Sequence, residues 1–249
     1  MEFFQKTDIG LKRENNEDAI GVFYNQTEEA LAVIADGMGG HLGGDVASKI
    51  ALTKIGTHFK KTSDLKADEF INWIDEELIR VNDFIMEKSQ NDPKLYRMGT
   101  TFVGAFLSSD QKIVYANLGD TRGYLFKDGN LKQITIDQTL VNELLNNGEL
   151  SPQEAANFPN KNIITSTLGV DKKVDPIYRT VNLTGKEMIL LNSDGLSDMV
   201  SDEFIANKLA SSENPQNKVN ELVQEAKKNG GIDNISLILG TNLKRSDQA

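Results

Sequence analysis

The sequence predicts an α+β fold built on antiparallel β-sheets, with helices packed outside them. Apolar, β-branched runs of strand length recur along most of the 249 residues, and helical periodicity is confined to a few stretches. The links between successive strands are mostly of hairpin length, as at Asp128-Gly129, whose residue types favour a two-residue turn. Parallel strands would need crossovers of about a dozen residues, so the short links indicate antiparallel pairing.

The N-terminal half begins with strands and continues with two helices. We expect strands at 19–24 and 29–35, where β-branched and aromatic residues are frequent. A helix at 44–60 begins just after a glycine cluster, and a second at 68–89 carries one apolar stripe at i, i+3, i+4 spacing. Both helices therefore present a face that would be buried in a core.

The C-terminal half is mostly strand. Further strands are expected at 100–107, 112–118, 122–127, 131–136, 178–183, 187–193 and 234–240. A third apolar stripe predicts a helix at 216–228. The stretch 137–177 is the least regular, with short helical pieces at 138–147 and 152–157. We expect it to form an excursion over the surface.

Composition limits what this chain can be. No linker, repeat or low-complexity tract divides it, so we expect one domain over residues 1–243 and a polar tail at 244–249. The absence of cysteine excludes disulfides, thiolate metal sites and a cysteine nucleophile. A net charge of −10 argues against binding to nucleic acid or to anionic membranes. Neither a membrane-spanning run nor a signal peptide is recognisable, and we expect a cytoplasmic protein that acts as a monomer.

Four aspartates lie where expected strands end or begin. Asp36, Asp120 and Asp194 follow apolar runs, and Asp233 precedes one. A strand that stops at an aspartate delivers a carboxylate to the sheet edge on a rigid support. Several such ends converging would form a cage of hard oxygen ligands, which suits Mg²⁺ or Mn²⁺. The pattern points to metal-assisted hydrolysis, although each aspartate could instead serve only a turn or a helix cap.

Six motifs, in order along the chain, resemble those of the metal-dependent serine/threonine protein phosphatases of type 2C in their compact bacterial form. The motifs are Thr7–Asp18, Ala35–His41, Met98–Thr101, Asn117–Arg122, Ser193–Met199 and Gly230–Asn234. Together they span essentially the whole chain. The resemblance implies a four-layer sandwich of two antiparallel β-sheets flanked by pairs of helices, with a flap segment at about 140–170. This agrees with the order of strands and helices expected from the residues.

The resemblance also implies a centre with two Mn²⁺ or Mg²⁺ ions. Asp36 would bridge the two ions, the Gly37 carbonyl would add a ligand, and Asp194 and Asp233 would supply the remaining carboxylates. Asp120 resembles the ligand of a third ion that it would share with Asp194. A purely structural role in the tight turn between two strands remains the alternative for Asp120.

Residues around this centre have implied roles of their own. Arg13 matches the family arginine that grips the phosphate, and a guanidinium fork suits that task. His41 matches the candidate proton donor to the departing oxygen, a role that imidazole fills near neutral pH. Glu17 and Asp18 are expected to accept hydrogen bonds from water on the metals, with Asn234 in the same supporting layer. The plainer alternatives are a surface arginine, a histidine packed at a helix start and a solvated acidic loop.

The implied activity is hydrolysis of phosphoserine and phosphothreonine in proteins by metal-activated water, opposing a serine/threonine kinase that is itself an expected substrate. A catalytically weak relative that regulates by binding phosphoproteins is one rival, and every ligand position being filled argues against it. A Ca²⁺-binding module is another, but no EF-hand loop spacing is present. A phosphate-binding glycine loop of the nucleotide-binding type fails because no Gly-Lys-Ser/Thr follows the glycine cluster.

Two positions beside the flap depart from the family pattern. Gln138 stands where the family commonly has histidine, and Ser166 stands where it often has arginine. Neither position is an expected metal ligand. We therefore expect these departures to alter substrate docking and to leave catalysis intact.

Overall fold

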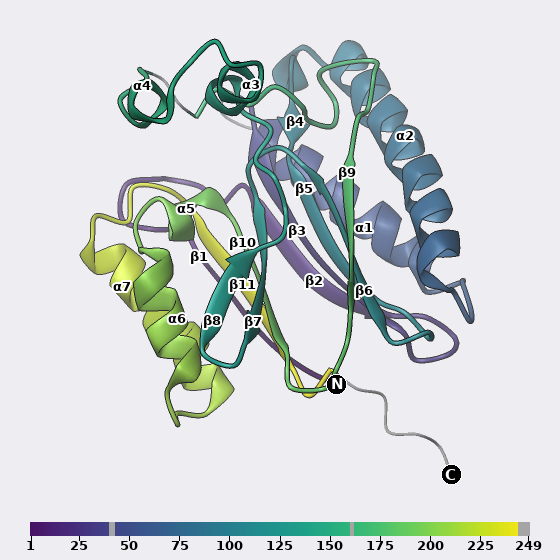
Figure 1. Ribbon diagram of the computed structural model, residues 1–249. Coiled ribbons are helices and arrows are strands. Elements are labelled where there is room, and N and C mark those ends of the chain that lie inside the picture. Colours follow the sequence, from purple (N-terminus) through teal and green to yellow (C-terminus); the bar gives the residue numbers. More distant parts are fainter. Residues whose placement is uncertain (40–42, 160–161, 244–249) are drawn as a thin grey trace.

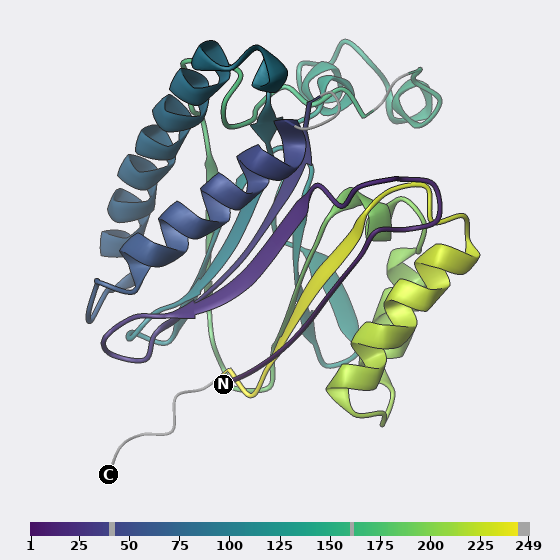
Figure 2. The ribbon, with the colours of Figure 1, turned by 180° about the vertical axis from the view of Figure 1, so that it is seen from behind.

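Two antiparallel β-sheets pack face to face at the centre of the protein, and helices cover the outer face of each (Figure 1). The computed structural model describes residues 1–39, 43–159 and 162–243. The predicted architecture of two antiparallel sheets flanked by helices is confirmed. Figure 2 shows the same layers from behind, with α1 and α2 on one side and α6 and α7 on the other.

The two sheets draw on strands from both halves of the sequence. In the first sheet the order is β1 (Glu2–Asp8), β11 (Ile235–Thr241), β10 (Met188–Asn192), β7 (Arg122–Lys127) and β8 (Asn130–Gln133). In the second it is β2 (Asp18–Tyr24), β3 (Ala30–Met38), β5 (Phe102–Leu107), β6 (Lys112–Leu118) and β9 (Ile177–Asn182). The short strand β4 (Gly99–Thr100) pairs with the end of β3.

The helices form two outer layers and one excursion. Next to the second sheet lie α1 (Gly43–Phe59) and α2 (Ala67–Asn91), followed by the short helix η1 (Pro93–Leu95). Next to the first sheet lie α5 (Asp194–Ser197), α6 (Asp202–Ala210) and α7 (Pro215–Lys228). The helices α3 (Leu140–Asn146) and α4 (Pro152–Ala156) stand apart at one end of the sandwich, within the expected flap (Figure 1).

Strand β3 shows why the central strands are continuously apolar. Its residues Leu31, Val33 and Ala35 pack against α1 and α2, whereas Ala32 and Ile34 pack against the other sheet. All five side chains are fully buried. Because side chains alternate between the two faces of a strand, a sheet covered on both faces needs apolar residues at every position.

Several elements differ from the sequence-based prediction. Strand β1 was not expected, because five of its seven residues are polar, yet it pairs with β11 over its whole length. Helix α6 was also missed. The strand expected at 100–107 is interrupted at Thr101, whose backbone N–H donates to the Asp36 carbonyl at 2.8 Å. The Asp128-Gly129 hairpin turn is confirmed, with both residues at positive φ.

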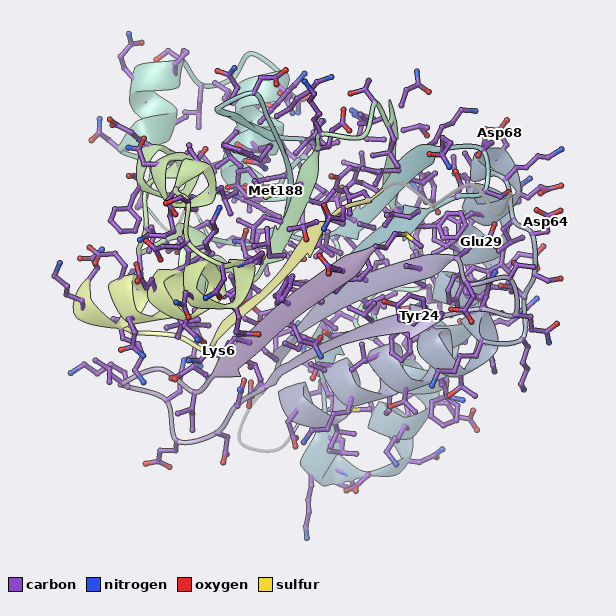
Figure 3. The ribbon with its side chains drawn as sticks, turned by 90° about the horizontal axis from the view of Figure 1, so that it is seen from below. Lys6, Tyr24, Glu29, Asp64, Asp68 and Met188 are labelled. Atoms are coloured by element: carbon purple, nitrogen blue, oxygen red, sulfur yellow. The ribbon has the colours of Figure 1, made fainter. Side chains whose placement is uncertain are left out.

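Buried polar contacts hold the opposite end of the sandwich together. Figure 3 views the molecule from that side, where Glu29 lies near Asp64 of the loop that joins α1 to α2. The buried Glu29 carboxylate accepts hydrogen bonds from Asn25 Nδ2 at 2.5 Å and from the Leu65 backbone N–H at 3.0 Å. This carboxylate therefore has a structural role in tying the β2–β3 loop to the helices.

Candidate active site

The carboxylates singled out in the sequence meet at one end of the sandwich. Asp36 at the end of β3 lies directly opposite Asp18 at the start of β2 in the strand register. Antiparallel pairing likewise brings the end of β10, followed by Asp194, beside the start of β11, preceded by Asp233. These ends open into a cavity of about 380 Å³ whose lining includes Arg13, Glu17, Asp36, Gly37, Asp120, Asp194 and Asp233.

Two glycines allow the strand ends to approach closely enough to form this cavity. A side chain on Gly37 would begin 2.1 Å from the Gly44 carbonyl oxygen and 2.6 Å from that of Glu17. A side chain on Gly195 would begin 2.0 Å from the Asn234 carbonyl oxygen. All three distances are shorter than the 3.0 Å below which real Cβ contacts essentially never occur. In each Asp-Gly pair the aspartate supplies a carboxylate, and the glycine, which has no side chain, leaves room for the backbone of a neighbouring segment.

The cavity concentrates negative charge, because its described lining holds five carboxyl groups and a single cationic side chain, Arg13. Burial, followed by repulsion from Asp18, Asp194, Asp120 and Asp233, raises the pKa of Asp36 well above its usual value. Burial, with repulsion from neighbouring carboxylates, also raises the pKa of Asp194 to about 8. For Asp18 and Asp120, burial is the main cause of a pKa raised to about 6. Such a cluster favours bound protons or bound cations.

The donor set fits hydrated divalent ions. The buried Oδ1 atoms of Asp18 and Asp194 have no hydrogen-bond partner, and carboxylate oxygens are the ligands that hard cations prefer. Within the described residues, no three carboxylate or histidine side chains are arranged to hold an ion by themselves. Mg²⁺ keeps several water ligands and takes only one or two carboxylates, so this arrangement is compatible with such an ion.

Arg13 lies at the mouth of the cavity and pairs with Asp233. Its Nη2 is 2.6 Å from Asp233 Oδ2, and its side chain is 50% exposed. The loop that carries it is held by Asn234, whose side chain accepts from the Glu17 N–H at 2.8 Å and donates to the Ile9 and Asn15 carbonyls at 2.9 Å. Arg13 and Asn234 therefore lie where the sequence analysis expected them, at the edge of the carboxylate cluster.

Two further residues position the carboxylates and were not assigned roles from the sequence. Thr101 lines the cavity and clamps the backbone of Asp36: its Oγ1 accepts from the Asp36 N–H at 3.0 Å, and its own N–H donates to the Asp36 carbonyl at 2.8 Å. Ser193 donates through Oγ to Asp18 Oδ2 at 2.9 Å. Both belong to the recognised motifs, which was the only signal available in the sequence.

A smaller polar cavity of about 210 Å³ adjoins the first and shares Asp120 and Asp194 with it. One wall is the ion pair between Arg122 and Asp137, at 2.7 Å. Asn162, from the flap, reaches Asp198 Oδ2 at 3.0 Å across this cavity. Asp120 thus lies between two cavities, a position that a turn residue on the outside of the molecule would not occupy.

Gln138 fastens the neck of the flap to the backbone beside Asp120. Its backbone N–H and its Oε1 pair with the carbonyl and N–H of Gly119, each at 2.9 Å. On its other side, the Gln138 carbonyl accepts from Thr165 N–H at 2.9 Å. Ile164, next to Thr165, lines the carboxylate cavity. The position that departs from the family pattern therefore connects the flap to the site. His41 lies outside the described residues.

Comparison with known proteins gives concordant results over nearly the whole chain. The sequence profile of the family described as Protein phosphatase 2C matches residues 12–231. The chain is 40% identical over 235 residues to the serine/threonine phosphatase stp of Listeria welshimeri, covering 94% of this chain and 93% of the relative. It is 38% identical over 240 residues to protein phosphatase PhpP of Streptococcus pneumoniae, covering 96% of each.

Solved structures agree with these sequence matches. The serine/threonine phosphatase of S. agalactiae superposes with a TM-score of 0.91 at 36% identity, covering 96% of this chain and 98% of that structure. Serine/threonine phosphatase Stp1 from Staphylococcus aureus gives a TM-score of 0.90 at 37% identity, with 96% and 94% covered. The expected fold class is therefore confirmed by experimentally determined relatives as well as by the strand order.

Proposed function

The chain belongs to the protein phosphatase 2C family and is a protein serine/threonine phosphatase, and from this premise we propose that the carboxylate cavity is its catalytic centre. The cavity contains all five expected ligand residues, Asp36, Gly37, Asp120, Asp194 and Asp233. The single observation that carries the proposal is the excess of negative charge there, five carboxyl groups against one arginine, which together with burial raises the pKa values of Asp36 and Asp194. A bound cation would relieve that repulsion.

We infer that two Mn²⁺ or Mg²⁺ ions belong in this cavity, held by Asp36, the Gly37 carbonyl, Asp194 and Asp233. A third, weaker ion would lie toward the adjoining cavity, between Asp120 and Asp194, the two residues that line both cavities. When bound, such ions lower the pKa of water so that hydroxide is available near neutral pH, and they offset the charge of the phosphoryl group. Glu17 and Asp18 would orient water in the cavity.

Arg13 is proposed to hold the phosphoryl group of the substrate. Its guanidinium has five N–H donors, and among the described residues the bond from Nη2 to Asp233 is the one that engages it. The side chain is half exposed at the cavity, where its planar fork could bind two phosphoryl oxygens. Arg13 would stabilise the equatorial oxygens while the bond to the serine or threonine oxygen breaks.

His41 is proposed to supply the proton that the departing oxygen needs. Gly39 lines the cavity, and His41 follows it by two residues in the sequence. Imidazole can exchange a proton near pH 7, and it is the side chain most often used as a general acid. The only other histidine, His58, pairs with Glu77 at 2.6 Å at the far end of α1.

In the cell, the enzyme is proposed to oppose a serine/threonine kinase and to act on phosphorylated proteins that include that kinase. We propose that it does so in the cytoplasm and as a monomer. In the part of the chain that the structure describes, none of the helices is both long and apolar enough to cross a membrane.

The proposal is tested by phosphate release from phosphoserine and phosphothreonine peptides. Wild-type protein should release phosphate with Mn²⁺ or Mg²⁺ and stop when a chelator is added. Asp36→Asn should be inactive and yet melt as one cooperative unit. Hydrolysis that continues at full rate in excess chelator, or in Asp36→Asn, would refute the assignment of the centre. Tight peptide binding without turnover would favour the regulatory alternative.

A further inference from the structure

A second cavity, of about 690 Å³, lies between the C-terminal end of α2 and the segment 169–171. It is larger than the catalytic cavity and is bordered by Tyr96 and Arg97, which follow η1. Figure 1 shows that α2 ends close to β4, at the end of the sandwich where α3 and α4 also stand. The cavity thus lies on the side of the molecule that substrate must approach.

Both walls of this cavity are fixed by buried polar residues. On one wall, the buried Ser89 donates to the Leu95 carbonyl at 2.8 Å and accepts from the Arg97 N–H at 3.0 Å. On the other, the buried Asn82 accepts from the Gly169 N–H at 2.7 Å and donates to the Asp171 carbonyl at 2.9 Å. The cavity is therefore formed before any ligand arrives, which lowers the cost of binding.

Tyr96 and Arg97 are held in an unusual, outward-facing arrangement. Arg97 has φ 57°, a left-handed conformation that costs an L-residue about 1 kcal/mol or more. The Ser89 hydrogen bond stabilises that turn. Tyr96 is 72% exposed, and no ion pair is formed by Arg97 among the described residues, even with Asp171 across the cavity. Tyrosine and arginine are the residue types most enriched at binding hot spots.

The backbone that borders this cavity lies beside the backbone of the catalytic site. A side chain on Gly39, which lines the catalytic cavity, would begin 3.3 Å from the Arg97 carbonyl oxygen. Thr101, only four residues after Arg97, is hydrogen-bonded to Asp36. Four residues span at most about 14 Å, so Arg97 lies within reach of a peptide extended by about four residues from a phosphate at Asp36.

We propose that this cavity binds the segment of the phosphoprotein substrate that flanks the phosphorylated residue. Tyr96 would pack against that segment, and Arg97 would pair with an acidic side chain about three to five residues from the phosphorylated one. Arg97 forms no ion pair among the described residues, which points to an acidic side chain as its partner. The closeness of its backbone to that of Gly39 in the catalytic cavity points to the substrate as the occupant. This inference rests on the proposed function and adds a selectivity that the metal centre cannot provide.

The test compares phosphothreonine peptides that differ only in carrying glutamate, glutamine or lysine at positions three to five residues on either side of the phosphothreonine. Wild type should show a kcat/KM for the best glutamate peptide about three- to fivefold above its glutamine counterpart, as expected of one partly exposed ion pair. Arg97→Asn should abolish that difference. Asparagine tolerates the left-handed backbone, so the variant tests the charge without straining the turn. Arg97→Lys should retain a preference for glutamate.

Lys132→Asn is the matched control, because it removes one exposed positive charge from β8 on the other sheet and should keep the preference. Hydrolysis of nitrophenyl phosphate, which cannot reach Arg97, should be equal in all variants. A wild type indifferent to the flanking charge, or a glutamate preference that survives Arg97→Asn, would overturn the proposal. A preference for the lysine peptide that is lost in Asp171→Asn would also overturn the proposal. If wild type hydrolysed none of these substrates, the proposed function would itself fail.

Discussion

Replacing Asp194 with asparagine should stabilise the metal-free protein. In the unfolded chain this carboxyl has its ordinary pKa of 3.8, whereas burial, reinforced by Asp120 and Asp233, raises its pKa to about 8 in the fold. At pH 7 the folded protein therefore retains a proton that the unfolded chain releases. Because folding raises the pKa of this acidic group, the free energy of unfolding falls as the pH rises above 3.8, and the fall levels off above about pH 8.

The size of this effect follows from the same two pKa values. From 3.8 to pH 7 is about three pH units, and each unit corresponds to about 1.36 kcal/mol, so the penalty approaches about 4 kcal/mol. Water that enters the cavity would reduce it, and we expect the asparagine variant to gain about 2–4 kcal/mol in unfolding free energy at pH 7. At pH 5 the gain should fall to about 1–2 kcal/mol.

The assay is urea unfolding in excess chelator at pH 5 and pH 7. Asp83→Asn, the same change on the exposed face of α2, is the control and should leave stability unchanged. With Mn²⁺ present the order should reverse, because the wild type keeps a ligand that the variant lacks. If Asp194→Asn were no more stable than wild type at pH 7 in chelator, burial and the neighbouring carboxylates would not be raising the pKa of Asp194, and the main support for a cation site would be lost.

Four further variants probe the groups around the centre. Arg13→Ala should raise KM by about tenfold or more with little change in kcat, as expected for a charged hydrogen-bond donor that binds the phosphate. His41→Ala should lower kcat by about a hundredfold on phosphopeptides. It should lower kcat far less on a nitrophenyl ester, whose leaving group needs no proton. Asp120→Ala should lower phosphopeptide turnover at saturating Mn²⁺ without changing the thermal melt. If the variant instead lost stability but kept wild-type turnover per folded molecule, Asp120 would be a turn residue only. Gln138→Leu should raise KM for phosphopeptides severalfold and speed hydrogen exchange of the Gly119 amide. Gln153→Leu, on the exposed flap helix α4, is the control. Unchanged exchange at Gly119 in Gln138→Leu would show that Gln138 does not anchor the flap.

The sequence was sufficient for those features that depend on local patterns. Apolar runs and Asp-Gly pairs located most strands and placed Asp36 and Asp194 correctly at strand ends, because a strand end is a local property. Contacts across the chain were not predictable in this way. Asn234 binds the carbonyl of Ile9, 225 residues away, and Gln138 pairs with Gly119, 19 residues away. Such partners depend on strand order, which no single segment encodes.

Strand β1, helix α6 and the interruption at Thr101 were not predicted for a related reason. Among the described strands, β1 pairs only with β11. Five of its seven residues are polar and none is fully buried, so its pattern resembles a loop. Helix α6 buries only Ile205 and Leu209, which is too narrow a stripe to recognise in nine residues. Thr101 appears in the sequence as part of a strand, and only the structure shows that it interrupts the strand to hold Asp36.

The central claim is that the carboxylate cavity binds the metal ions of a phosphatase, and counting those ions tests it most directly. Mn²⁺ binding to chelator-treated protein, measured by titration calorimetry on wild type, Asp36→Asn and Asp233→Asn, should give two tightly bound ions per chain in wild type. The two variants should lose at least one of these ions together with phosphate release, while their thermal melts remain cooperative. Equal stoichiometry and affinity in wild type and Asp36→Asn would contradict the account.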